Sequence, residues 1–336
     1  MSKILTVSIA SYNAECYLEK CLDSFTRTEV LDDLEIFVVN DGSEDNTGAI
    51  GKKYERLYPY SVKIINKENG GHGSTINESI KNATAKYFKI VDADDWVEKE
   101  GIEKLVRFLK LNTVDLILNP YLEINASDEN ETQIVFPGTN SVEMGMQFEL
   151  EKIDDLMLYM HSITYRTELL KMMGPIIDEH CFYVDMEYSL FPLQYVKTGI
   201  CLEFPVYNYL LGTATQSMNM NNLIKRRDQH LKITKRLIIY YEDNKNVLEG
   251  FKKRLFCERL KYAALNQYKI YFHMNSNEGR EELRQFDKWL KKCSKDVYRG
   301  PEGRFMKIIK FNRFLNFFLY GLSTSIFKKL KILPYA

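Results

Sequence analysis

The sequence predicts an α/β protein with a mainly parallel sheet and a helical C-terminal region. In the first 125 residues, short apolar runs rich in β-branched residues alternate with segments whose apolar residues recur at helical spacing. The runs are almost uninterrupted, as in strands that helices cover on both faces. A length of 336 residues is enough for a sizeable core and for two units.

The elements follow one another in a regular order up to residue 124. Apolar runs bounded by turn residues predict strands at 4–12, 34–42, 62–66, 86–92 and 114–124. The segments between them predict helices at 14–25, 46–58, 73–84 and 99–112. In sheets of this kind, ligands bind beyond the carboxyl ends of the strands.

The distribution of charge divides the chain. Residues 1–222 carry 19 Lys and Arg against 35 Asp and Glu, whereas residues 223–336 carry 27 against 11. We therefore expect a catalytic and ligand-binding domain at 1–222 and a basic helical region at 223–336. An acidic domain can hold cations but binds nucleic acid poorly, and we expect no nucleic-acid partner. The basic region suits an acceptor, a membrane surface or another subunit.

The cysteines and the N-terminus indicate a cytoplasmic protein. Six scattered cysteines without a CxxC pair are typical of reduced thiols, not of a zinc site or a disulfide framework. The start MSKILTVSIASYN lacks the longer apolar core and the cleavage site of a signal peptide. No run reaches the roughly 18 apolar residues of a membrane span.

Polar or glycine-rich clusters follow four of the predicted strands. SYN follows the first strand, NDGS the second, NKENGGHGS the third and DADDW the fourth. Because the carboxyl ends of parallel strands meet at one edge of the sheet, these clusters predict a single binding site.

The stretch KIVDADDW places Asp92, Asp94 and Asp95 directly after an apolar run. A solvated turn is one interpretation; an EF-hand is excluded because its glycine and terminal glutamate are missing. In an extended chain Asp92 and Asp94 point the same way and Asp95 the opposite way. Two such carboxylates suit Mg²⁺ or Mn²⁺ shared with diphosphate oxygens, which is the interpretation that we favour.

Two further clusters have both a structural and a functional interpretation. NDGS alone is an ordinary turn, but Asp41 at a strand end can accept a hydrogen bond from a base such as uracil. KENGGHGSTIN can present backbone N–H groups to a phosphate or a nucleoside, although it matches no P-loop. His72 in this turn has a structural role or contacts the donor, and the sequence leaves both open.

Taken in order, SIASYN, VVNDGSEDNT, NGGHGSTINESIKNATAKYFKIVDADDW and FYVDMEYSL resemble the motifs of family 2 inverting glycosyltransferases. The resemblance spans residues 4 to about 190 and is nearest to bacterial enzymes of capsule, exopolysaccharide or wall teichoic acid. It implies a GT-A fold, which is a Rossmann-like, mainly parallel sheet flanked by helices. It also implies metal-dependent transfer, with Mn²⁺ or Mg²⁺, from a UDP-sugar to a hydroxyl of a saccharide or lipid-linked acceptor.

The resemblance assigns the nucleotide site residue by residue. Tyr12 matches the aromatic side chain that lies against the base, and Ala10 contributes backbone. Asp41 matches the aspartate that recognises uracil, while Asn69 and Gly71 lie in the loop that covers the uridine.

The resemblance also assigns the metal site and the base. Asp92-Ala93-Asp94 matches the DxD motif, with Asp92 near the ribose and the metal and Asp94 on the metal. Asp185 matches the catalytic base, although Val184 stands where relatives usually have glutamate. An acid at a helix N-terminus is the structural alternative for Asp185, and Glu187 is the second choice of base.

One departure concerns an arginine near the nucleotide. Many relatives have Ala-Arg-Asn where this chain has Thr75-Ile76-Asn77. We expect His72 or Lys67 to replace that arginine.

The stretch 304–335 carries seven Lys and Arg and no acid. One interpretation is a C-terminal helix that packs on the domain or in a homo-oligomer. The other is an interfacial helix that makes a peripheral contact with the inner face of the cell membrane.

Two other functions remain as alternatives. A sugar nucleotidyltransferase needs a glycine-rich, basic loop after the first strand, where this chain has SYNAECYLEK. A non-catalytic scaffold protein that binds sugar nucleotides needs Asp92 and Asp94 but not Asp185.

Overall fold

The computed structural model describes residues 2–137, 141–173, 177–212 and 220–329. The chain forms two compact units, Met1–Ala214 and Thr215–Ala336. This division lies eight residues before position 222, where the charge changes sign. Within the described residues, no helix combines the length and the hydropathy that a membrane span needs.

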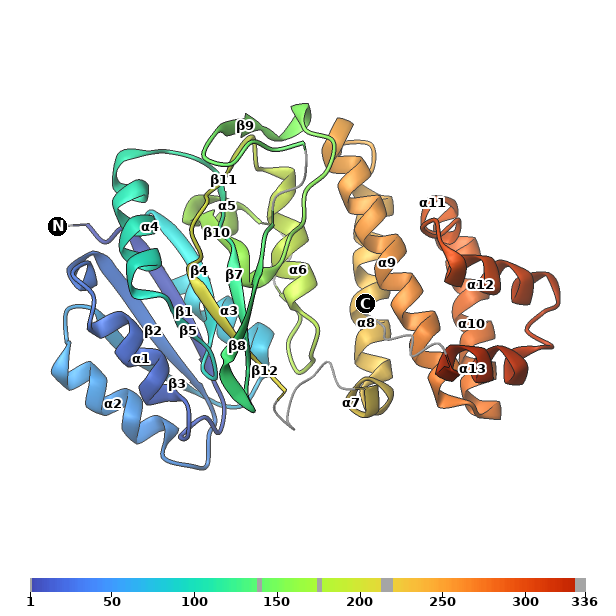
Figure 1. Ribbon diagram of the computed structural model, residues 1–336, viewed down its shortest axis with the longest axis horizontal. Coiled ribbons are helices and arrows are strands. Elements are labelled where there is room, and N and C mark those ends of the chain that lie inside the picture. The colour runs from blue at the N-terminus through green and yellow to red at the C-terminus, as the bar shows by residue number, and fades with distance from the viewer. Residues whose placement is uncertain (1, 138–140, 174–176, 213–219, 330–336) are drawn as a thin grey trace. The chain divides into compact units, whose positions relative to one another are not determined.

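An eight-stranded sheet in the order β3-β2-β1-β4-β10-β6-β11-β9 forms the centre of the first unit (Figure 1). The pairs β3-β2, β2-β1, β1-β4 and β6-β11 are parallel, whereas β10 and β9 pair antiparallel to their neighbours. The strands are β1 (Leu5–Ser11), β2 (Leu34–Asp41), β3 (Val62–Lys67), β4 (Tyr87–Asp92), β6 (Leu116–Leu118), β9 (Gln147–Glu149), β10 (Ile163–Arg166) and β11 (Thr198–Cys201).

Helices cover this sheet on both faces, because right-handed crossovers place α1 and α2 on one face and α3 on the other (Figure 1). The apolar residues of β1 and β2 are buried between them, except that Ala10 is partly exposed. The predicted fold class, a mainly parallel α/β sheet, is therefore confirmed. The helices are α1 (Leu18–Thr26), α2 (Thr47–Leu57), α3 (His72–Asn82), α4 (Lys99–Leu111), α5 (Thr167–Met172) and α6 (Asp185–Leu190), with 3₁₀ turns at Leu31–Asp33, Leu150–Lys152, Met160–Ser162 and Phe191–Gln194.

A second sheet, β5-β12-β7-β8, belongs to the same unit. Its strands are β5 (Trp96–Val97), β7 (Tyr121–Asn125), β8 (Asp128–Val135) and β12 (Tyr207–Leu211). The single strand predicted at 114–124 is wrong, since β6 and β7 lie in different sheets. Pro120 separates them, because proline has no N–H to continue a ladder. The polar stretch after residue 125 is a hairpin arm, β8, paired antiparallel with β7.

The second unit is helical, as predicted. Several helices pack around the long α9 (Gly250–Met274), whose buried residues lie along most of its length. The others are α7 (Met220–Lys225), α8 (Arg227–Asn244), α10 (Asn277–Cys293), α11 (Lys295–Tyr298), α12 (Arg304–Phe314) and α13 (Tyr320–Lys329).

Candidate functional site

The register of the sheet brings the predicted clusters together. Ala10 pairs with Val39 on one side and with Asp92 on the other, and Asp41 pairs with Lys67. The ends of β3, β2, β1 and β4 therefore lie side by side at one edge. Tyr12 follows β1 and is exposed, so its ring is open to a ligand.

Asp41 organises the glycine-rich loop after β3. Its buried carboxylate accepts hydrogen bonds from Gly70 N at 2.9 Å and Gly71 N at 2.8 Å, and Lys67 Nζ lies 2.8 Å from Oδ1. Asn69 Nδ2 donates to the Asp41 carbonyl oxygen at 3.0 Å. Both carboxylate oxygens thus have protein partners, and recognition of a base by Asp41 stays a prediction.

Helix α3 links this loop to the segment before Asp185. A Cβ at Gly73 would lie 1.8 Å from the Asp178 carbonyl oxygen, so only glycine permits the contact. Asn77 donates to Ile177 O at 2.8 Å and accepts from Ile177 N at 3.0 Å. The Gly70 carbonyl oxygen accepts from His180 N. Segments far apart in the sequence are therefore joined at the site.

The two carboxylates considered as the base have different surroundings. Asp185 is the first residue of α6, and its side chain is exposed. Glu187 is completely buried and accepts from Asp178 N at 2.7 Å. Just before α6, His180 and Tyr183 have φ angles of +55° and +69°, conformations that cost free energy and often occur at functional sites. Solvent access favours Asp185 as the group that meets a substrate.

His72 lies among three carboxylates. Its Nε2 is 3.2 Å from Asp92 Oδ1, a distance that suits an ion pair. Burial lowers the pKa of His72, but Asp92, Asp185 and Asp94 act in the opposite direction, and the pKa is raised overall. Lys67 pairs with Asp41, so the two side chains considered as substitutes for the missing arginine serve different carboxylates.

The DADD stretch separates into partly exposed and buried acids. Asp92 and Asp94 are partly exposed, whereas Asp95 is buried and accepts from Tyr207 OH at 2.5 Å and Leu210 N at 2.8 Å. Burial and the Asp92 carboxylate raise the pKa of Asp94 to about 6. Burial also raises the pKa of Asp92, but His72 and His161 outweigh it and lower that pKa overall. Crowded carboxylates of this kind favour a cation.

His161, in the 3₁₀ turn before β10, is a residue that the sequence analysis missed. Among the described residues, ligand atoms of Asp92, Asp95 and His161 lie within 4.8 Å of one another. Burial lowers the pKa of His161 to about 4, so its imidazole is neutral at pH 7. The ring stacks on Tyr209 with centroids 4.1 Å apart, and its Nδ1 has no hydrogen-bond partner among the residues that the structure describes.

This donor set fits a divalent cation. Carboxylate oxygens suit Mg²⁺ and Mn²⁺, and a neutral imidazole is a ligand that Mn²⁺ also accepts. A single histidine before a strand carries no sequence signal of such a role, because only the antiparallel pairing of β10 with β4 brings it beside Asp92.

Comparisons with known proteins agree with this architecture. The family model "Glycosyl transferase family 2" matches residues 6–172. Glycosyltransferase GlyA of Streptococcus pneumoniae is 36% identical over 124 residues, which cover 37% of this chain and 18% of GlyA. The uncharacterized glycosyltransferase EpsJ of Bacillus subtilis is 28% identical over 214 residues, which cover 62% of this chain and 61% of EpsJ. The chain thus matches less than two thirds of the length of either relative.

Among solved structures, S. aureus TarS 1–349 in complex with UDP-GlcNAc aligns with a TM-score of 0.67. The alignment covers 98% of this chain and 92% of the TarS chain at 15% identity, so it shows a shared fold. The family match and this fold lead to one conclusion: the chain belongs to glycosyl transferase family 2 and has the GT-A fold.

Proposed function

We propose that the protein is a metal-dependent, inverting glycosyltransferase. It moves a sugar from a UDP-sugar to a hydroxyl group of a bacterial surface polysaccharide or of a related lipid-linked acceptor. The observation that carries the proposal is the arrangement of Asp92, Asp94 and Asp185 around His72. At the same edge of the sheet, Asp41 binds the glycine-rich loop after β3 through hydrogen bonds.

Asp185 is the proposed catalytic base. Its exposed carboxylate takes the proton of the acceptor hydroxyl while that oxygen attacks the anomeric carbon. The bond from the anomeric carbon to the diphosphate breaks, and its electron pair leaves with UDP. Attack from the face opposite the leaving group inverts the configuration. The pKa of Asp185 is raised because neighbouring protein atoms remove part of the water around its carboxylate, with a further contribution from Asp92, while His72 acts in the opposite direction. A raised pKa suits a group that must accept a proton.

The proposed nucleotide-sugar site is formed by Ala10, Tyr12, Asp41, Asn69, Gly71, His72, Asp92 and Ala93. Asp92 and Asp94 would hold Mn²⁺ or Mg²⁺, and Asp95 and His161 offer further ligand atoms next to Asp92. When bound, the cation neutralises negative charge on the departing diphosphate. TarS, which shares the fold, was solved with UDP-GlcNAc, and this supports a UDP-sugar as the donor.

The proposed place of the reaction is the cytoplasm, at the inner face of the membrane for a lipid-linked acceptor. All six cysteines are free, in agreement with a reducing compartment.

Calorimetric titration with UDP and a panel of UDP-sugars, with Mn²⁺ and with EDTA, tests the donor and the metal together. We expect one UDP-sugar to bind only in the presence of the cation. A GDP-sugar panel is the control for the base. Binding of a GDP-sugar alone would overturn the uridine assignment, and no binding of any nucleotide sugar would overturn the proposed function.

A further inference from the structure

Helices α12 and α13 present a row of large apolar side chains to solvent. Phe311 is 57% exposed, Phe314 85%, Phe318 75% and Leu322 61%. These residues recur every three or four positions, across the end of one helix and the start of the next. Single exposed apolar residues are ordinary, but four within twelve residues indicate an interaction surface. We call these four residues the apolar row.

The turn between the two helices holds the row outward. Phe317 and Tyr320 are buried, and Phe317 N donates to Asn312 O at 2.7 Å. The Arg284 guanidinium donates twice to the Asn316 carbonyl oxygen, at 2.8 and 3.1 Å. Tyr320 OH donates to the carbonyl oxygen of Tyr271 in α9. The exposure of Phe314 and Phe318 is therefore a consequence of a fixed turn and not of a frayed end.

Basic side chains flank the apolar row. Arg304, Lys307 and Lys310 are exposed on α12, and no acid follows Glu302 in the sequence. Within the part of the chain that the structure describes, Lys307 and Lys310 form no ion pair. A surface with aromatic side chains and unpaired cations complements an anionic lipid surface. A second copy of the same face would bring like charges together, which disfavours self-association there.

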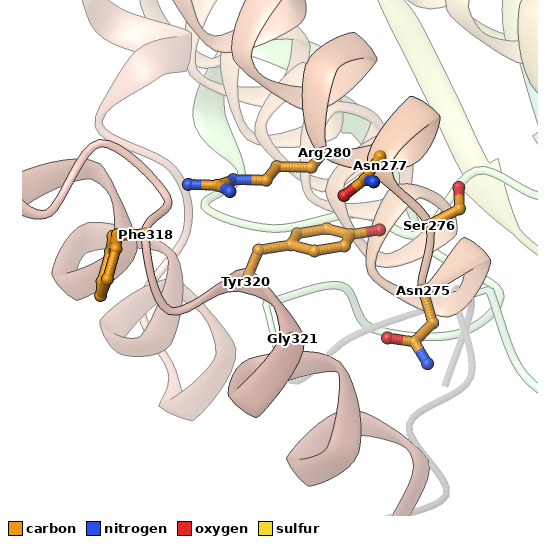
Figure 2. Close-up of a pocket in the computed structure, with 7 residues that line it drawn as sticks. All are labelled: Asn275, Ser276, Asn277, Arg280, Phe318, Tyr320 and Gly321. Atoms are coloured by element: carbon orange, nitrogen blue, oxygen red, sulfur yellow. The ribbon is translucent and has the colours of Figure 1, made fainter.

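A pocket of about 370 Å³ adjoins the row. Figure 2 shows its lining, in which Phe318 and Tyr320 come from the turn and α13, and Arg280 comes from α10. None of the seven lining residues is acidic. Arg280 forms no ion pair with any described residue, and its Nε is buried without a hydrogen-bond partner. A guanidinium presents N–H donors in the geometry of phosphate oxygens.

We propose that this face of the second unit docks on an anionic membrane surface. The apolar row enters the interfacial region of the bilayer, Lys307 and Lys310 lie against anionic headgroups, and the Arg280 pocket receives a lipid phosphate. This docking requires neither donor nor cation, so it holds or fails independently of the proposed transferase reaction.

Flotation of the full-length protein with vesicles tests the proposal. We expect the protein to bind vesicles of phosphatidylcholine with phosphatidylglycerol and to bind pure phosphatidylcholine vesicles much more weakly. Phe314→Ser with Phe318→Ser should reduce binding about tenfold or more, because both rings leave the interface. Lys307→Gln with Lys310→Gln should reduce it about fivefold per lysine, and Arg280→Gln by a similar factor. All these side chains lie at the surface or in an open pocket, and circular dichroism checks that each variant is folded.

The matched control is Tyr60→Ser, which removes an exposed aromatic residue of the first unit. It should bind vesicles like the unaltered protein. Equal binding to both vesicle types would overturn the proposal, as would unchanged binding of the phenylalanine variant. A third outcome would assign this face to self-association and also overturn the proposal. In that outcome, light scattering shows a dimer that does not bind vesicles, and Phe314→Ser with Phe318→Ser dissociates the dimer. If inorganic phosphate bound at Arg280 without any vesicle binding, the pocket would belong to a free phosphate ligand and not to a lipid.

Discussion

The two units use charge in opposite ways. In the first, acids collect at one edge of a sheet, and His72, Lys67 and His161 lie next to them. In the second, Lys307 and Lys310 lie on the surface beside exposed phenylalanines and form no ion pair with any described residue. Clustered carboxylates favour the binding of a cation, whereas basic side chains spread over a surface favour contact with an anionic lipid surface. The formal neutrality of the whole chain thus hides two opposite distributions of charge.

The largest effect is expected from the base in the first unit. Asp185→Asn should lower kcat about a thousandfold, because the amide cannot accept the acceptor proton, while donor binding persists. The control is Glu187→Gln, which changes a buried carboxylate bonded to Asp178 N and should lower stability more than turnover. Single-turnover kinetics and thermal unfolding separate the two results. Full turnover of Asp185→Asn would remove it as the base.

A second prediction uses a buried histidine of the helical unit. Burial lowers the pKa of His230 to about 4, while its Nδ1 lies 2.5 Å from Gln267 Oε1. In the unfolded chain His230 therefore binds a proton near pH 6.5, whereas in the folded unit it binds one only near pH 4. The contribution of His230 to the free energy of unfolding of the helical unit is fully present above pH 6.5. It should fall by roughly 3 kcal/mol as the pH drops to 4.

The two tryptophans make this measurable, since Trp96 lies in the first unit and Trp289 in the second. In the Trp96→Phe protein, emission of Trp289 follows denaturant unfolding of the helical unit at each pH. Adding His230→Gln should flatten the dependence on pH. The same slope with and without His230 would contradict the prediction.

The third prediction asks whether the cation belongs to the acidic unit and which side chains hold it. Asp94→Asn and His161→Phe should each weaken Mn²⁺ binding about tenfold to a hundredfold. Electron paramagnetic resonance of free Mn²⁺ measures this without any turnover. Asp45→Asn changes an acid that accepts a hydrogen bond from Thr47 N at the start of α2, and it should have no effect. Unchanged affinity of His161→Phe would exclude the imidazole as a ligand.

The smallest effect separates Lys67 and His72, the two basic side chains of the candidate site. Lys67 contacts Asp41, so Lys67→Met should weaken uridine and UDP alike, by about fivefold to tenfold. His72 contacts Asp92, so His72→Ala should weaken UDP but not uridine and should raise the donor KM. Calorimetry with both ligands distinguishes the variants. If both variants weakened uridine and UDP in the same way, Lys67 and His72 would not contact different parts of the donor.

Much of the fold could be predicted because the hydrophobic period is strong in the parallel half of the sheet. The split at Pro120 was missed, since an apolar run crosses from one sheet to the other without a change of period. The hairpin arm β8 was missed because its residues are polar and exposed, so no alternation marks it.

The positions of the acids in the candidate site could be predicted where these residues lie in a short motif. Asp41 and Asp92 are the last residues of strands, Asp94 lies two residues after the end of β4, and Asp185 is the first residue of a helix. The contact of Lys67 with Asp41 depends on the register between β2 and β3, and the position of His161 beside Asp92 depends on the pairing of β10 with β4. Neither pairing has a signature in the local sequence. The side chains that lie next to the site acids could therefore be identified only from the structure.

The joint between α3 and the segment at 177–181 limits how this site can be re-engineered. Gly73 and Asn77 fit the backbone of that segment closely, so the glycine-rich loop after β3 and the segment before α6 form one structural module. A loop transplanted alone from a relative would pack against the segment 177–181 of this chain, whose backbone it does not fit. An exchange of this loop with that of a relative should therefore include both segments, 67–77 together with 177–185.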